Sequence, residues 1–308
     1  MNKKLLKKIK NLIFPAQNSI DFNFQNKQLM SDLDGLINSS SLSKIAQIQL
    51  FQSWKNLKNT QNSYPQLDAI EFRAFSQNGE DGILLYIFSQ IGIFNKRVVE
   101  VCAGDGIQCN SANLIINHGW EGLLFDGNDE LVKKGCRFYS SHPNTFSLPP
   151  VFVNAWIERE TINYLISTHG FSGEIDLLSI DVDGVDYWIW DAIDIINPRV
   201  VVTEIQCIWG ASHALTVPYS KSFQAPMVNG LPLYAGATLP AFVKLAKKKG
   251  YRLVGVNELG INAFFVKDHL CGSALPAVTP ETCLNKPFVK LAQKKLLPHV
   301  IDKEWVEV

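Results

Sequence analysis

Four carboxylates in this sequence have a spacing that suits chemistry on a hydroxyl group. The stretch "SIDVDGVDYW" supplies Asp181, Asp183 and Asp186 directly after an apolar run, and Glu204 ends the next such run, "RVVVTEI". If these runs are neighbouring parallel strands, Asp181 and Glu204 lie close together at the carboxyl ends of the strands, where open α/β sheets bind ligands. Two interpretations are open. Asp181, Asp183 and Glu204 hold Mg²⁺ or Ca²⁺, or the site is metal-free, with Asp181 on cofactor or acceptor and Asp183 capping the following helix.

A second group surrounds two glycines in "VVEVCAGDGIQCN", residues 98 to 110. Gly104 and Gly106 allow a ligand to approach the backbone, as in sites for nucleotide-like ligands. Glu100 would repel a phosphate, so we expect it beside a cation, and S-adenosylmethionine (SAM) carries an ammonium and a sulfonium group. Asp126 ends the next strand, where an acidic side chain accepts both ribose hydroxyls. An NAD site needs a third glycine, and Cys109 stands at that position.

A third candidate is His213, in a stretch from about 207 to 237 that shows no clear periodic element. Loops of this length are typically lids or binding loops, so we predict that 207–237 closes over an acceptor. Trp209, Tyr219 and Tyr234 offer stacking surfaces for a sugar. His213 is a candidate base, and the alternative is an exposed histidine without a catalytic role.

Short apolar runs alternating with helical patterns predict the sheet that positions these groups. The expected strands are 97–101, 122–126, 151–155, 175–181 and 199–205, and each is mostly apolar, as a strand covered on both faces requires. Residues 251–256 and 261–268 are joined by "NELG", which is too short for a parallel crossover and predicts an antiparallel hairpin. The fold class is therefore α/β: a Rossmann-like, mostly parallel seven-stranded sheet with a C-terminal antiparallel hairpin, helices on both faces and an N-terminal helical appendage.

The two ends of the chain differ from this central part. Residues 1–14 have a lysine face and an apolar face, which predicts either a helix docked on its own protein or a helix in contact with an anionic membrane surface. Residues 42–57 carry a second helical stripe. We therefore divide the chain into an appendage (1–70), a domain with the lid (71–275) and a C-terminal helical tail (276–308).

The composition argues against several classes of protein. The 308 residues contain 29 lysines and arginines and 29 aspartates and glutamates, which argues against a nucleic-acid partner. The apolar run near the N-terminus is too short to span a bilayer, and the six cysteines lack zinc-type spacing. We expect a cytoplasmic protein with reduced thiols. The oligomeric state is left open.

The motifs "VEVCAGDG", "LLFDGND", "EIDLLSIDVDGVDYWIW", "PRVVVTEIQ" and "GYRLVGVNELGINAFFV" resemble, in order, those of class I SAM-dependent methyltransferases. "SQNGEDGILLYIF" and "IDVDGVD" resemble more narrowly the FkbM group, which is generally assigned to O-methylation of sugars and other hydroxyl-bearing natural products. The resemblance covers roughly 72–270, and Cys102 stands where the family has its first glycine.

The resemblance implies a SAM site and a hydroxyl acceptor on a sugar, glycan or glycosylated small molecule. The cofactor residues expected on this basis are Gln77, Glu80, Glu100, Gly104, Asp105, Gly106, Asn110, Asp126, Asn128, Asn154, Ala155 and Asp181. Asn154 and Ala155 are expected to meet the adenine, and Gln77 and Glu80 to close over the methionine end, although Ser76 or Asn78 as a helix N-cap is an equally good account of that segment. The alternatives to an O-methyltransferase are an NAD-dependent oxidoreductase and a non-catalytic binding module with the same fold.

Overall fold

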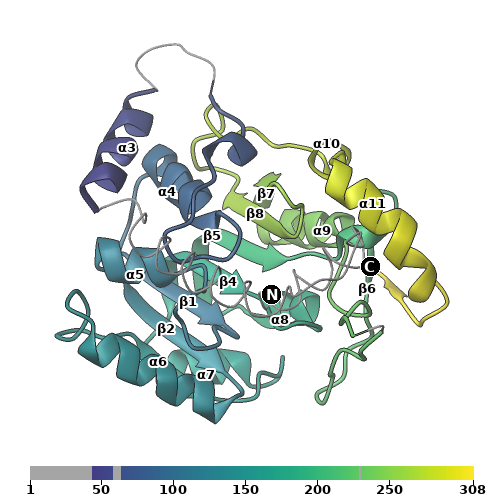
Figure 1. The fold of residues 1–308 in the computed structure, drawn as a ribbon, viewed down its shortest axis with the longest axis horizontal. Coiled ribbons are helices and arrows are strands. Elements are labelled where there is room, and N and C mark those ends of the chain that lie inside the picture. Colours follow the sequence, from purple (N-terminus) through teal and green to yellow (C-terminus); the bar gives the residue numbers. More distant parts are fainter. Residues whose placement is uncertain (1–43, 58–63, 229) are drawn as a thin grey trace, which may run out of the picture.

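The computed structural model describes residues 44–57, 64–228 and 230–308. The predicted helix at 1–14 lies outside the described residues. Within them, the centre of the molecule is a seven-stranded sheet in the order β3-β2-β1-β4-β5-β8-β7 (Figure 1). Its strands are β1 (Arg97–Val101), β2 (Glu121–Asp126), β3 (Val151–Asn154), β4 (Gly173–Ile180), β5 (Ile196–Glu204), β7 (Tyr251–Val256) and β8 (Asn262–Lys267).

The predicted fold class is confirmed. The pairs β1–β2, β1–β4, β2–β3 and β4–β5 are parallel, whereas β8 is antiparallel to both β5 and β7. Because chain order and sheet order differ, the chain reverses its direction of winding between β1 and β4. This is the position at which open α/β sheets bind ligands.

Helices cover both faces of the sheet. Each strand carries apolar side chains on both of its faces, and both faces must therefore be shielded from water. Val98 belongs to the core cluster that also contains buried residues of α4 (Glu80–Ile91), α5 (Ala112–His118) and α6 (Asp129–Ser141). Val99 belongs to the cluster that contains buried residues of α7 (Ile162–Thr168), α8 (Asp186–Ala192) and α9 (Leu239–Lys249). Both valines are fully buried. Strands buried on both faces have continuous apolar sequences, and this is why the predicted strand boundaries lie close to the observed ones.

The appendage is represented by α3 (Lys44–Asn56), which lies beside α4 in Figure 1. Gln47 is fully buried and accepts hydrogen bonds from Asn113 Nδ2 (2.9 Å) and the ring of His118 (2.8 Å). Gln90 of α4 donates to the carbonyl of Trp54 at 2.7 Å. These bonds fix α3 to the sheet's helical layer, and the short helix η2 (Leu67–Ile70) follows it.

The C-terminal part contains α10 (Pro280–Leu284), α11 (Pro287–Leu296), η4 (Leu297–His299) and β9 (Val306–Glu307). Strand β9 pairs with β6 (Leu215–Thr216), which lies inside the predicted lid, and this small sheet was not predicted. The division into three domains stays a prediction.

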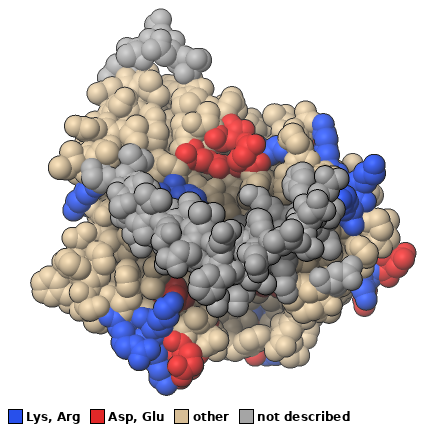
Figure 2. Space-filling model, in the orientation of Figure 1, with Lys and Arg blue, Asp and Glu red and all other residues tan. Residues whose placement is uncertain are grey.

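Charges on the face shown in Figure 2 are not arranged as one basic surface. Acidic side chains gather in a patch, and lysines and arginines lie in separate groups toward the rim. Among the described residues, no helix has the length and apolarity that crossing a bilayer requires.

Candidate functional site

A large open cavity lies at the carboxyl ends of β1, β2 and β4. Its volume is about 940 Å³, within the range of small-molecule sites. It is lined from the start of α4, the β1–α5 loop, the end of β2 and the residues after β4. Most residues predicted for the cofactor line it: Gln77, Glu80, Glu100, Gly104, Asp105, Asn110, Asp126, Asn128 and Asp181.

The β1–α5 loop turns back through three residues with left-handed backbone: Cys102 (φ +62°), Gly104 (φ +62°) and Gly106 (φ +68°). A Cβ on Gly104 would meet no atom within 4 Å, whereas one on Gly106 would approach the ring of Phe152 to 2.6 Å. Cys102 takes the left-handed conformation that a glycine adopts without cost, so the turn forms with a cysteine at this position. The loop therefore exposes backbone to the cavity at Gly104.

Glu100 organises this loop directly. It is 3% exposed, and its two carboxylate oxygens accept from the backbone amides of Asn110 (2.9 Å) and Ser111 (2.8 Å). The sequence placed Glu100 beside a cation of the ligand. The structure brings it to the cavity, but its closest partners are loop amides, so its first role is to fix the loop. Asn110 in turn donates to Ser179 Oγ on β4 at 3.0 Å.

Asp126 links the glycine loop to the start of α6. Its oxygens accept from the amides of Gly104 (2.8 Å) and Asn128 (2.8 Å), and a carboxylate retains further acceptor capacity. Asn128 is the N-cap of α6 and accepts from the amides of Glu130 and Leu131. Asp105 forms an ion pair with Lys134 at 2.6 Å.

Gln77 and Glu80 differ in whether their side-chain oxygens have hydrogen-bond partners within the protein. Glu80 is buried, and its carboxylate accepts from Asn257 Nδ2, Asn262 Nδ2 and the Asn78 amide. Gln77 Oε1 is buried and has no hydrogen-bond partner in the described part of the chain. A buried acceptor left unpaired is costly, so Gln77 fits a ligand that donates a hydrogen bond.

The alternative account of this segment, with Ser76 or Asn78 as the N-cap of the helix, was wrong. The N-cap of α4 is Gly79, with φ +97° and no side-chain cap. Ser76 Oγ instead accepts from the amide of Asp81, and the Asp81 carboxylate accepts from the amides of residues 74 to 76. Burial raises the pKa of Asp81 to about 6.

Asn154 and Ala155, expected at the adenine, are not among the residues that line the cavity. Asn154 Nδ2 donates to the carbonyl of Asp126 (3.0 Å), and the Ala155 amide donates to the same carbonyl (3.1 Å). The next residue, Trp156, lines the cavity and is 52% exposed, which is unusual for so large an apolar side chain. Sequence reasoning missed it, although an aromatic residue directly after a strand end was a signal available there.

The carboxylates of Asp181, Asp183 and Glu204 come together as predicted, with ligand oxygens all within 4.8 Å of one another. Desolvation, then the charge of Asp181, raises the pKa of Asp183 to about 6. Burial, followed by the charges of Asp181 and Asp183, raises the pKa of Glu204 well above its usual value. Such mutual repulsion is relieved by a bound cation or a shared proton, and hard oxygen donors suit Mg²⁺ or Ca²⁺.

The helix after this cluster is not capped by Asp183, which corrects the metal-free interpretation in that detail. The N-cap of α8 is Val185, without a side-chain cap, and Asp183 has left-handed backbone with φ +52°. Asp186 is buried and accepts from the amides of Val182 (2.8 Å) and Gly184 (3.1 Å). Asp186 therefore holds the turn that presents Asp183.

His213 lies away from the cluster. Its ring is exposed and packs edge-on against Trp209 with centroids 5.6 Å apart, and it lines neither the large cavity nor the smaller one described below. The geometry does not bring it to the carboxylates.

The predicted lid contains two kinds of structure. Its ends are buried around η3 (Cys207–Trp209) and β6. Its middle lies against the segment after β3, where Trp156 Nε1 donates to the Lys221 carbonyl (2.6 Å) and Tyr219 donates to Glu160 (2.6 Å). The middle thus lies next to Trp156 at the large cavity, and its action as a lid stays a prediction.

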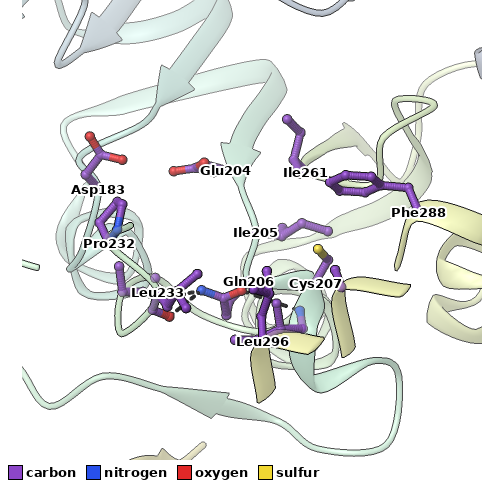
Figure 3. A pocket seen from close by; sticks show the side chains of 14 residues that line it. Asp183, Glu204, Ile205, Gln206, Cys207, Pro232, Leu233, Ile261, Phe288 and Leu296 are labelled. Carbon is purple, nitrogen blue, oxygen red and sulfur yellow. Dashed lines mark hydrogen bonds between the residues drawn. The ribbon is translucent and has the colours of Figure 1, made fainter. Parts of the chain in front are cut away.

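A smaller, narrower cavity of about 60 Å³ begins at Asp183 and Glu204 and continues between η3 and α11 (Figure 3). Asp183 lines both cavities. The carboxylate cluster therefore stands where the two spaces meet.

No family model matches this chain, and no curated protein matches it by sequence. Solved structures that it resembles include magnesium protoporphyrin IX methyltransferase from Synechocystis PCC 6803 with bound SAM, at 8% identity over 87% of this chain and 93% of that one, with a TM-score of 0.36. A SAM-dependent methyltransferase from Clostridium acetobutylicum is 7% identical over 71% and 98%, with a TM-score of 0.38. A putative caffeoyl-CoA O-methyltransferase from Staphylococcus aureus is 14% identical over 79% and 99%, with a TM-score of 0.40. Scores and identities this low carry no argument about activity.

Proposed function

We propose that this chain is a SAM-dependent methyltransferase that transfers a methyl group to a hydroxyl of a sugar, glycan or glycosylated small molecule. The observation that carries the proposal is the large cavity at the winding reversal, with an exposed backbone turn at Gly104 and with Asp181 and Asp183 of the carboxylate cluster in its lining. The sugar acceptor rests on the resemblance of the sequence motifs to the FkbM group.

The residues around the cavity fit SAM at three places. Gln77 Oε1 needs a hydrogen-bond donor, which the α-ammonium of SAM provides. Asp126 has remaining acceptor capacity for ribose hydroxyls. Trp156 offers an exposed ring against which an adenine can stack. Among the described residues that line the cavity, Glu100 lies beside the glycine turn, where its negative charge would repel a pyrophosphate, and this disfavours the NAD alternative.

The cluster of Asp181, Asp183 and Glu204 is proposed to act on the acceptor hydroxyl. Methyl transfer requires the hydroxyl oxygen to be aligned with the methyl carbon and to lose its proton. A carboxylate of the cluster accepts this proton or orients the hydroxyl. A divalent cation held by the same three carboxylates would lower the pKa of the hydroxyl.

Further parts of the proposal concern the setting of the enzyme. We propose a cytoplasmic location and a role in carbohydrate or polysaccharide biosynthesis. Contact between the basic N-terminal residues and a membrane surface, and any oligomer, also stay proposals.

The proposal is tested by incubating the full chain with methyl-labelled SAM and a carbohydrate fraction, then measuring label in sugars released by hydrolysis. Asp181→Asn and Glu204→Gln should lose transfer while binding SAM and keeping the wild-type melting temperature. If EDTA stops transfer and Mg²⁺ restores it, the metal interpretation holds, and if EDTA has no effect, the metal-free one holds. Near-normal transfer in both variants would remove the cluster from the mechanism.

A further inference from the structure

The smaller cavity differs from the large one in the chemistry of its walls. Apart from Asp183 and Glu204 at its mouth, its side chains are mainly apolar and come from the end of β5, η3, the 232–236 segment and α11 (Figure 3). Among the apolar residues are Ile208, Leu233, Phe288, Ala292 and Leu296.

Among the described residues that line this cavity, Gln206 is the one with an amide side chain, and its hydrogen-bonding groups already have partners. Gln206 Nε2 donates to the carbonyls of Leu233 (2.9 Å) and Ala235 (3.3 Å), and its Oε1 accepts from the Ile208 amide (3.4 Å). Burial raises the pKa of the Cys207 thiol to about 12, so this group is uncharged. A hydroxyl entering the cavity beyond the carboxylates would lose its water without gaining a partner of comparable strength, which is costly.

The wall formed by α11 is held firmly against the domain. A Cβ on Gly210 would lie 2.2 Å from Gln293 Nε2, and one on Gly260 would lie 2.8 Å from Val289. Val289, Ala292 and Leu296 are buried. Because α11 packs this closely on η3 and on the β7–β8 turn, the cavity has a defined size.

We propose that this cavity binds a small apolar substituent of the methyl acceptor, carried on the carbon next to the hydroxyl that is methylated. The inference rests on the proposed function. With the hydroxyl at Asp183 and Glu204, the neighbouring carbon points into the cavity, where only an apolar group is satisfied. A cavity that holds benzene measures about 150 Å³. The smaller space here fits a methyl or branched alkyl group and excludes an aromatic ring.

The test uses small alcohols as probes of the full chain, by saturation-transfer NMR with and without S-adenosylhomocysteine. Isobutanol places a branched alkyl group next to a hydroxyl, and glycerol replaces that group by hydroxyls. We expect saturation of the isobutanol methyl groups and no comparable signal from glycerol. Ala292→Leu, which fills the cavity, should lose the isobutanol signal, whereas Ala277→Leu, at an exposed position outside the cavity, should keep it.

A second variant keeps the test decisive if Ala292→Leu does not fold. Leu296→Ala enlarges the same cavity and should create a signal for benzyl alcohol that the wild-type chain lacks. Equal isobutanol signals in wild type and Ala292→Leu, an equal signal from glycerol, or no gain for benzyl alcohol in Leu296→Ala would overturn the proposal. Calorimetry of S-adenosylhomocysteine on the same samples reports the proposed function separately, because alcohol binding does not require the cofactor.

Discussion

Replacing Glu100 by glutamine should destabilise the protein, because Glu100 holds the loop on which the proposed SAM site is built. In the structure each carboxylate oxygen accepts one backbone amide, from Asn110 and from Ser111. Glutamine keeps one acceptor oxygen and turns an NH₂ group toward the other amide. One charge-assisted hydrogen bond is then lost, and one buried amide has no acceptor.

The magnitude follows from these two changes. A hydrogen bond to a charged group contributes about 1.5–3 kcal/mol, and an unpaired buried group costs about 1–3 kcal/mol. Because the lost bond and the unpaired amide are partly the same loss, the two terms do not add in full, and we expect the free energy of unfolding to fall by roughly 2–4 kcal/mol. With an m-value of about 1–3 kcal/mol/M in urea, the midpoint should fall by on the order of 1 M.

The assay is urea unfolding, followed by circular dichroism, of the wild type, Glu100→Gln and the control Glu130→Gln. Glu130 is an exposed glutamate at the start of α6, so its variant should stay within about 0.5 kcal/mol of the wild type. A Glu100→Gln variant as stable as the control would refute the role of Glu100 in holding the loop. SAM binding by the folded fraction of Glu100→Gln should also weaken.

Two further predictions address the cavity and the appendage. Gly104→Ala and Gly119→Ala each put a Cβ on left-handed backbone (φ +62° and +67°) where it meets no atom within 4 Å, so both should lose about 1 kcal/mol of stability. Only Gly104→Ala should weaken SAM binding in calorimetry, by about tenfold, because only Gly104 lines the large cavity; equal affinities would contradict the placement of the ligand. Burial lowers the pKa of His118 to about 4, so its neutral ring, bonded to Gln47, contributes stability that is fully present above pH 6.5 and is lost as pH falls toward 4. His118→Gln should flatten this pH dependence, which is checked by measuring the melting temperatures of the wild type and the variant at pH 7 and pH 4. If the difference between the two proteins is the same at both pH values, His118 has no such role.

The sheet was largely predictable because its strands carry their own pattern. Continuous apolar runs bounded by turns located all seven strands to within three residues at either end, and the short "NELG" link required the hairpin. The meeting of Asp181 with Glu204 followed from adjacency of β4 and β5. These inferences depend only on local pattern and on the geometry of parallel strands.

The details of the site were less predictable because they depend on which side chains accept hydrogen bonds from the backbone amides of the loops. Nothing in the sequence indicates that Asp186, rather than Asp183, holds the turn after β4. Nor does it indicate that both carboxylate oxygens of Glu100 accept hydrogen bonds from backbone amides ten and eleven residues away. The wall supplied by α11 was equally hidden, since its approach to η3 is a contact between segments far apart in the chain.

Titration calorimetry of the full chain with SAM measures whether the large cavity binds this cofactor. We expect one SAM bound per chain, displaced by S-adenosylhomocysteine and unaffected by NADH, with binding weakened in Gly104→Ala and not in Gly119→Ala. The absence of SAM binding by folded protein, or competition by NADH for the same site, would show that the cavity is not a SAM site.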